Sequence, residues 1–411
     1  MDRSLKLWVF SKNMDRWYKN LLRDHFEENR QLALVSGPRQ CGKTTAAQQL
    51  DPSTHYLTWD NPEQREWILA GHQALAHRFG LDQLGQKPLV ILDEVQKYPD
   101  WKNWLKGFFD VWGSHCRILA TGSARLDHFS RGGDSMMGRY LSYRMHPLSV
   151  GEIVAPHRTA TDLLLPPREI SDPDWKALWE FGMFPEPFLR RDRRFFTRWS
   201  RLRLDQTVRE DLRDLTRATE ISRVELLAEL LRARAAQSLT FSDLARGVRS
   251  SVESVQRWVD HLEALHLVFL VRPWFRNISK ALTKEPKVYL RDGSTISDPG
   301  ARFENMVACH LLKAVQGWED AGLGSFALHY LRDTEKREVD FLVVRDDTPW
   351  FLVEAKTSDT RPTDTLRHFQ KATGAPHAFQ VVRDLPYVDI DPFTRNDPVA
   401  VPARTLLSQL P

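Results

Sequence analysis

The first 155 residues alternate short apolar runs with stretches of helical periodicity. The runs are apolar at consecutive positions, which is typical of parallel strands buried on both faces of a sheet. Strands that alternate with helices in this way predict a doubly wound α/β domain over residues 1–155, entered by a helix within residues 1–30. The four runs predicted as strands are QLALVSG at 31–37, HYLTWD at 55–60, PLVILDE at 88–94 and CRILATGS at 116–123.

Beyond residue 155 the pattern changes twice. Residues 156–220 predict a helical connector, and its segment 190–217 holds ten arginines and five acids. This excess of positive charge fits either a solvated helix face with i,i+4 ion pairs or a contact with nucleic acid or a partner. Residues 221–275 predict a helix, a helix-turn-helix and the first strand of a hairpin, which is the order of elements in a winged helix.

The predicted helix-turn-helix has a polar face that could meet DNA. Its first helix, FSDLARGV, is expected to have Ser242 as its N-cap. Its second helix leaves Ser254 and Arg257 exposed, and in DNA-binding winged helices this helix enters the major groove. Winged helices also serve as packing modules, and that alternative stays open. The apolar stripe of the second helix comprises Val252, Val255, Val259, Leu262 and Leu265.

Residues 276–395 return to mixed α/β periodicity. A helix is predicted over residues 300–315, and residues 396–411 are expected to form a short tail. The segments ALHYLRD, EVDFLVVRD, WFLVEAK and AFQVVRD predict four strands.

The first apolar run leads into a phosphate-binding motif. Residues 37–44, GPRQCGKT, match G-x-x-x-x-G-K-[ST], and the motif follows a strand and opens a helix. Its backbone N–H groups and the helix N-terminus would cradle the phosphates, with Lys43 on the β- and γ-phosphates and Thr44 on Mg²⁺. The predicted ATP-binding residues are Gly37, Pro38, Arg39, Gln40, Cys41, Gly42, Lys43, Thr44 and Thr45.

Two later strands end in groups that would complete an ATPase site. Asp93 is expected to hold Mg²⁺ and Glu94 to polarise the attacking water. A hydroxyl at the end of the next strand, Ser123 or alternatively Thr121, would sense the γ-phosphate.

Two arginines follow this last strand. Arg125 or Arg139 could reach the nucleotide of a neighbouring subunit as an arginine finger, which would imply a homo-oligomer. A structural or surface role is the alternative for each.

Composition narrows the setting without deciding the function. The chain has 411 residues, is 42% hydrophobic and carries a net charge of +4, so charge alone does not demand nucleic acid. No run approaches the roughly 18 apolar residues of a membrane span, and no apolar signal segment begins the chain. Three widely spaced cysteines predict neither a disulfide framework nor a zinc site, and together these features predict a reduced, cytoplasmic protein.

The motifs resemble the bacterial and archaeal AAA+-type P-loop ATPases that carry a C-terminal domain of unknown function, DUF4143. The resemblance implies an α/β multidomain fold with an ATPase core, a winged helix and a restriction-endonuclease-like domain over residues 276–395. Relatives usually show Asp-Thr-Gly where this chain has Asp292-Gly293-Ser294, so that loop is assigned no role. The resemblance covers most of the chain and rests on SGPRQCGKTT, LDEVQKYPDW, TGSAR, MGRYLSYRMHPLSVGEI, FGMFPEPF, KVYLRDGS, RFENMV and EVDFLV…EAK.

A second group of charged residues lies on two predicted strands of the C-terminal domain. Asp340 and Glu354 are separated by 13 residues, and Lys356 follows, which is similar to the D-x(n)-E-x-K core of PD-(D/E)XK nucleases. Two such carboxylates can bind Mg²⁺ beside a phosphate while the lysine assists the water. Glu304 matches an extra acid of some of these nucleases, and Glu338 shares the face of Asp340 by alternation. The alternatives are ordinary charged strand ends or a retained fold with a dead site.

Taken together, the sequence predicts a Mg²⁺-dependent AAA+-type ATPase that acts on DNA by remodelling or by processing strands or junctions, with a nuclease-like C-terminal module. The alternative is an ATP-dependent signalling switch that binds protein partners and carries a catalytically dead nuclease-like domain. A third possibility is a Mg²⁺ nuclease with a structural ATPase core, which would cleave DNA without ATP. Steep salt dependence of DNA binding would favour the first.

Overall fold

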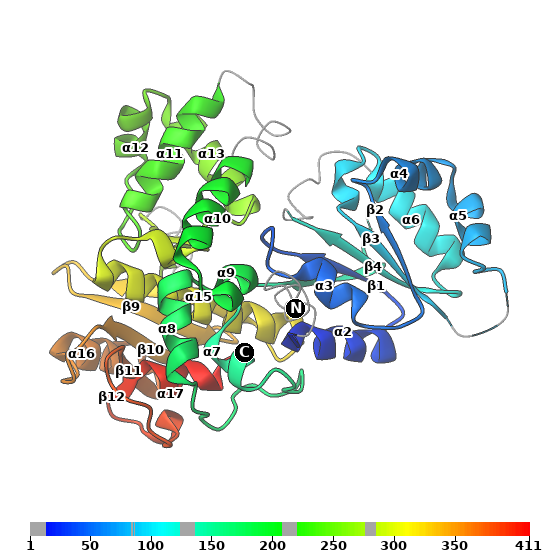
Figure 1. The fold of residues 1–411 in the computed structure, drawn as a ribbon. Helices are drawn as coiled ribbons and strands as arrows, with labels where there is room; N and C mark the ends of the chain where they lie inside the picture. Colours follow the sequence, from blue (N-terminus) through cyan, green and yellow to red (C-terminus); the bar gives the residue numbers. More distant parts are fainter. Residues whose placement is uncertain (1–13, 84, 86, 124–135, 208–219, 276–284) are drawn as a thin grey trace. The chain divides into compact units, whose positions relative to one another are not determined.

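The computed structural model describes residues 14–83, 85, 87–123, 136–207, 220–275 and 285–411 (Figure 1). They belong to two compact units. The first contains the chain up to Pro147 together with residues 157–160, and the second contains residues 148–156 and 161–411. The predicted winged helix and C-terminal domain therefore lie within one unit. No helix of the described residues is both long and apolar enough to cross a membrane.

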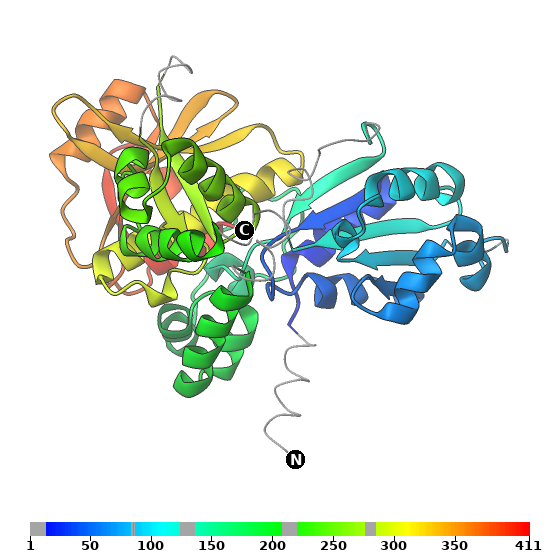
Figure 2. The ribbon, with the colours of Figure 1, turned by 90° about the horizontal axis from the view of Figure 1, so that it is seen from above.

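The first unit is built on a five-stranded sheet in which every neighbouring pair is parallel, in the order β2-β3-β4-β1-β5 (Figure 2). This is the parallel sheet typical of a P-loop core, and the four predicted strands are confirmed. The strands are β1 Leu32–Ser36, β2 Thr54–Thr58, β3 Leu89–Asp93, β4 Arg117–Gly122 and β5 Tyr140–Arg144. The helices are α2 Trp17–Glu28, α3 Lys43–Gln48, α4 Pro62–Leu69, α5 His72–Arg78, η1 Val95–Lys97 and α6 Trp101–Trp112.

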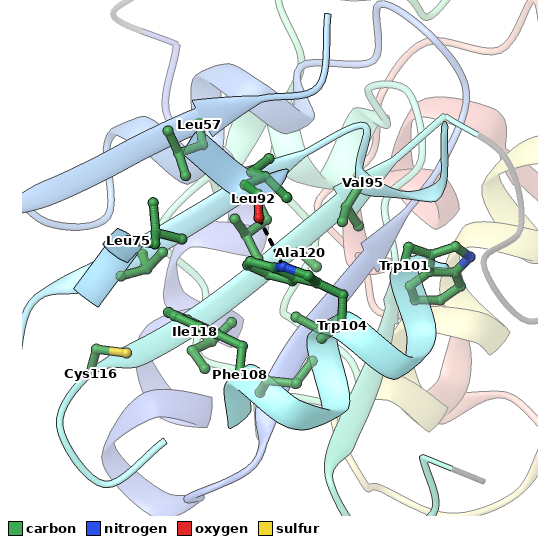
Figure 3. Packing of buried hydrophobic residues seen from close by; sticks show 14 of the residues in the cluster. Leu57, Leu75, Leu92, Val95, Trp101, Trp104, Phe108, Cys116, Ile118 and Ala120 are labelled. Carbon is green, nitrogen blue, oxygen red and sulfur yellow. Dashed lines mark hydrogen bonds between the residues drawn. The ribbon is translucent and has the colours of Figure 1, made fainter. Parts of the chain in front are cut away.

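The core of the first unit fixes the strands that carry the candidate site. Trp104 and Phe108 of α6 stack on each other and pack with Leu92 of β3 and Ile118 of β4 (Figure 3). The indole Nε1 of Trp104 donates to the carbonyl oxygen of Ile68 at 3.0 Å, so this large side chain is buried without an unpaired donor. The carboxyl ends of β3 and β4 are thereby held rigidly side by side.

The second unit contains a seven-stranded mixed sheet in the order β12-β11-β10-β9-β8-β6-β7. Helix α15 packs on β7, β8, β9 and β10, and α16 packs on β9, β10 and β11. The strands are β6 Val268–Pro273, β7 Lys287–Leu290, β8 Phe326–Arg332, β9 Glu338–Arg345, β10 Thr348–Lys356, β11 His377–Val382 and β12 Val399–Pro402. The helices are α7 Val150–Val154, α8 Asp172–Phe181, α9 Pro185–Arg190, α10 Arg193–Gln206, α11 Ile221–Ala233, α12 Phe241–Val248, α13 Val252–Ala264, η5 Gly293–Thr295, α15 Pro299–Asp320, α16 Asp364–Thr373, η6 Pro392–Thr394 and α17 Ala403–Gln409.

Helices α11 to α13 and the antiparallel pair β6–β7 follow the winged-helix order, and Ser238 forms the additional bridge to Lys287. Three expectations are corrected. The N-cap of α12 is Thr240 rather than Ser242, and Val252 is 39% exposed instead of joining the buried stripe. Strand β6 also pairs with β8, so the sheet runs on past the boundary expected at residues 275/276.

The C-terminal residues are not a tail. Strand β12 pairs in parallel with β11, and α17 packs against α7. A Cβ on Gly151 of α7 would lie 1.8 Å from the carbonyl oxygen of Leu410, so only glycine permits this approach. The apolar run VAVP was too short to be recognised as a strand, although its pairing completes the sheet edge.

A buried histidine makes the second unit sensitive to acid. The Nε2 of His310 accepts the N–H of Val150 at 3.1 Å, and its Nδ1 lies 2.8 Å from the carbonyl oxygen of Met306, so the ring fits only as the neutral tautomer. Burial, with a smaller contribution from nearby Lys313, lowers the pKa of His310 to about 4.

We expect this histidine to cost stability as the pH falls. Because its folded-state pKa lies below the unfolded value of about 6.5, its stabilising effect is present above pH 6.5 and is lost toward pH 4. The free energy of unfolding should fall by about 2 kcal/mol between pH 7 and pH 5 on this account. Urea unfolding at both pH values measures it, and His310→Gln, which keeps an acceptor for Val150, should remove that part of the fall. An unchanged pH slope in the variant would contradict the assignment.

Candidate nucleotide site

The phosphate-binding loop is shaped by positions that need unusual backbone conformations. Gln40 and Gly42 have positive φ values of 63° and 100°, which turn the chain between β1 and α3. At Gly37 a Cβ would lie 2.2 Å from the carbonyl oxygen of Met145, so the loop requires glycine there. The ammonium of Lys43 donates to the carbonyl oxygens of Gly37 at 2.8 Å and Pro38 at 2.9 Å, and so lies inside the loop that would hold phosphates.

Asp93 is held at the end of β3 by hydroxyl groups. Its Oδ2 accepts from Thr44 at 2.9 Å and from Tyr56 at 2.6 Å, and its Oδ1 accepts from Thr121. Burial, together with the neighbouring Asp93 carboxylate, raises the pKa of Tyr56, so the phenol stays protonated and donates. Sequence reasoning brought Thr44 and Asp93 together but missed Tyr56. Nothing in the sequence indicated this contact beyond a tyrosine hydroxyl on β2, the strand next to β3.

Glu94 stands at the point where β3 passes into a short 3₁₀ turn, and its φ of 55° turns its side chain out of the strand path. Its N–H donates to the carbonyl oxygen of Thr121 at 2.9 Å. Its Oε2 accepts from Ser123 at 3.1 Å and from Gln96 at 2.6 Å. The structure thus places the expected water-polarising acid beside the expected γ-phosphate sensor. It also adds Gln96, which lies in the motif LDEVQKYPDW but was assigned no role from the sequence.

Of the two candidate arginine fingers, Arg139 lies within the described residues and has an acidic partner. Arg125 lies outside the described residues. The guanidinium of Arg139 is bidentate on Asp110 of α6, with Nε 2.7 Å from Oδ1 and Nη2 3.1 Å from Oδ2. A role for Arg139 in a neighbouring subunit would require this pair to open, and it stays a hypothesis.

Arg16 supports the loop from below and was not found by sequence reasoning. Its guanidinium is 4% exposed and donates to the carbonyl oxygens of Cys41 and His146, the latter at 2.7 Å. A cation buried against carbonyl oxygens fixes the path of the loop just before Gly42.

We expect Arg16→Met to weaken ATP binding. Losing these charged hydrogen bonds loosens the loop, and a tenfold rise in the Kd for ATP corresponds to about 1.4 kcal/mol. Titration with a fluorescent ATP analogue measures the change. Lys19→Met is the matched control, because Lys19 lies on the same helix and pairs with Asp15. Equal affinities for wild type and Arg16→Met would contradict a supporting role.

The protein groups of this site fit a magnesium ion bound together with nucleotide. Mg²⁺ in phosphate sites takes one or two protein oxygens and completes its shell with phosphate and water. The hydroxyl of Thr44 and the carboxylate of Asp93 are such oxygens, 2.9 Å apart beside the loop.

Comparison with known families agrees with this geometry. Residues 29–154 match the family described as AAA domain, and residues 299–389 match the domain of unknown function DUF4143. The chain therefore resembles P-loop ATPases in which an AAA domain is combined with a C-terminal DUF4143 domain. Between these matches, residues 172–297 match another domain of unknown function, DUF8612.

Two curated proteins and two solved structures are similar to this chain at 24% identity or less. The uncharacterized proteins Rv2008c of Mycobacterium tuberculosis and Mb2031c of Mycobacterium bovis are each 24% identical to it over 345 residues, 82% of this chain and 73% of theirs. AMPPCP-bound DnaA from Aquifex aeolicus is 12% identical, with a TM-score of 0.30 over 59% of this chain and 86% of DnaA. Caenorhabditis elegans PCH-2 is also 12% identical, with a TM-score of 0.23 over 63% of this chain and 69% of PCH-2.

In the second unit, three acidic side chains surround a lysine that sequence reasoning missed. The ammonium of Lys287, at the start of β7, lies 3.0 Å from Glu304, 2.6 Å from Glu338 and 3.4 Å from Asp340. Burial alone would lower the pKa of Lys287, but the three carboxylates outweigh it and raise that pKa. Burial and the nearby Asp340 raise the pKa of Glu304 to about 7.

The remaining members of the predicted D-x(n)-E-x-K core have other partners. Glu354 accepts from Thr363 at 2.5 Å and pairs with Lys356 at 2.9 Å. The Oδ2 of Asp340, the oxygen that does not face Lys287, accepts the N–H of Ala355 at 2.9 Å. Within the described part of the chain, no group of three or more His, Cys, Asp or Glu side chains is arranged to hold a metal ion.

The two DNA-contact candidates on α13 are partly engaged. The hydroxyl of Ser254 accepts from Ser251, the N-cap of the helix, and Arg257 lies 3.4 Å from Glu220. About half of the Arg257 side chain is exposed and could still reach DNA. Its contact with DNA stays a prediction.

Proposed function

We propose that this protein binds Mg-ATP in the first unit and hydrolyses it. The observation that carries the proposal is the meeting of Thr44, Asp93, Glu94 and Ser123 at the ends of three adjacent parallel strands, beside the lysine of the phosphate loop. Mg²⁺, held by Thr44 and Asp93, would neutralise phosphate charge when bound.

The other groups divide the remaining work. The loop N–H groups and Lys43 bind and orient the phosphates. Glu94 polarises the attacking water and takes its proton, and Ser123, which donates to Glu94, holds that carboxylate in place and senses the γ-phosphate.

We further propose that the ATPase acts on DNA. Arg194, Arg198 and Arg201 are exposed at helical spacing on one face of α10, and among the described residues these three have no acidic partner. The i,i+4 ion pairs expected of a solvated helix face are therefore missing at these three positions in the described part of the chain. An unpaired stripe of arginines, with a winged helix in the same unit, favours contacts with phosphates.

The test is ATP hydrolysis by the full chain with and without duplex, single-stranded and branched DNA, at several salt concentrations. Stimulation by DNA that weakens steeply with salt supports the proposal. Changing Arg194, Arg198 and Arg201 together to Gln should remove the stimulation and leave basal hydrolysis unchanged. Hydrolysis indifferent to every DNA would contradict DNA action and favour the switch that binds protein partners. Absence of any hydrolysis would contradict the ATPase itself.

A further inference from the structure

The second unit places a cation of its own where a nuclease-like site would hold a metal. The side chain of Lys287 is 4% exposed, and its ammonium has carboxylate oxygens of Glu304, Glu338 and Asp340 within 3.4 Å. These oxygens come from α15 and β9, while the lysine comes from β7. Three elements therefore converge on a single buried positive charge.

Local backbone geometry supports this arrangement. Where His329 pairs with Leu342 and Leu331 pairs with Val339, two residues of β9, Asp340 and Phe341, lie opposite one residue of β8. Such a shift in register re-aims side chains. The Tyr289 hydroxyl donates to the same Glu304 oxygen that contacts Lys287, at 2.7 Å, so this oxygen is satisfied by two donors of the chain itself.

The carboxylates expected to share a metal ion are divided between two lysines. Asp340 and Glu304 face Lys287, whereas Glu354 faces Lys356 and Thr363. A divalent ion bound to Asp340 would lie within a few ångströms of the ammonium of Lys287, whose side chain is 4% exposed, and the two positive charges would repel each other. The positions for a metal ion and for this ammonium thus exclude each other.

We infer that the Lys287 ammonium is the resident cation of this acid cluster, so that the C-terminal site is a metal-free ionic junction and not a nuclease centre. The junction ties β7, β9 and α15 together. The second unit then serves as a binding or coupling module, whichever partner the ATPase acts on.

The test counts Mn²⁺ ions bound to the nucleotide-free full chain by electron paramagnetic resonance. All proteins carry Thr44→Val, which removes the hydroxyl ligand of the ATP site. In this background, Asp340→Asn should change nothing, because no ion is bound there. Lys287→Met should gain about one Mn²⁺ per chain, and adding Asp340→Asn should abolish that gain. Loss of a bound Mn²⁺ on Asp340→Asn alone would overturn the inference, as would a folded Lys287→Met variant that gains none.

A matched control and a second variant make the outcome decisive. Lys356→Met removes the lysine that pairs with Glu354. This lysine is more exposed than Lys287, and its loss should lead to no gain of an ion. If it gains the same ion as Lys287→Met, the special place of Lys287 is contradicted. If Lys287→Met fails to fold, the double variant Lys287→Met with Glu338→Gln takes its place, because it removes one of the carboxylates that repel each other. It should likewise gain about one Mn²⁺ per chain. Cleavage of DNA in Mn²⁺ that depends on Asp340 in the otherwise unchanged chain would also overturn the inference.

Discussion

Replacing Glu94 with Gln is expected to stop ATP hydrolysis while leaving ATP binding intact. The amide keeps the size of the side chain, and its oxygen can still accept from Ser123 and Gln96. It cannot take a proton from the attacking water, and such general-base groups typically contribute about 10²- to 10⁴-fold to the rate. Phosphate release should therefore fall by at least about a hundredfold, and the Kd for a fluorescent ATP analogue should change less than threefold, or about 0.6 kcal/mol.

Two further variants sharpen this result. Glu63→Gln alters an exposed acid of α4 in the same unit and should hydrolyse ATP like wild type. Lys43→Ala should instead lose ATP binding, since it removes the cation inside the phosphate loop. A Glu94→Gln variant that hydrolyses ATP at nearly the wild-type rate would mean that another group activates the water.

The nucleotide site could be predicted because its parts are local motifs placed by one topological rule. Each motif directly follows a strand, and the ends of adjacent parallel strands meet at one edge of the sheet. The loop at residues 37–45, the acids after β3 and Ser123 after β4 are therefore neighbours although they are far apart in the sequence. Alternation likewise placed Glu338 and Asp340 on one face, and both contact Lys287.

What sequence reasoning missed depends on pairings between distant segments. Lys287 and Arg16 stand in no motif whose chemistry marks them, and each gains its role only through contacts with residues far along the chain. Tyr56 contacts Asp93 only because β2 happens to be the neighbour of β3. Patterns of periodicity identify the elements, but they do not identify which charges the folded sheet brings together.

The segment HPLSVGEI illustrates the same limit. It follows the ATPase motifs in sequence, and the domain expected over residues 1–155 included it. The structure assigns residues 148–156 to the second unit, where the hydroxyl of Ser149 and the carboxylate of Glu152 both contact the ammonium of Lys313 on α15. The polar residues of this motif therefore serve the core of the second unit.

Breaking this buried pair is expected to destabilise the second unit strongly. Lys313 and Glu152 are 0% and 1% exposed, and their charged atoms lie 2.5 Å apart. Lys313→Met leaves the Glu152 carboxylate buried without its cation, which typically costs about 3–5 kcal/mol. Urea unfolding followed by tryptophan fluorescence measures the loss. The control Lys176→Met breaks an exposed i,i+4 pair with Glu180 and should change stability by less than about 1 kcal/mol.

The double variant Lys313→Met with Glu152→Met separates two roles of the pair. If the pair mainly avoids an isolated buried charge, replacing both partners by apolar side chains should recover most of the stability lost in Lys313→Met. If the pair instead fixes how α7 docks on α15, the double variant should stay as unstable as the single one, because both variants lose the hydrogen bonds from Lys313 to Ser149 and Glu152. The close approach of Gly151 to Leu410 already orients α7 through its backbone, so we expect recovery.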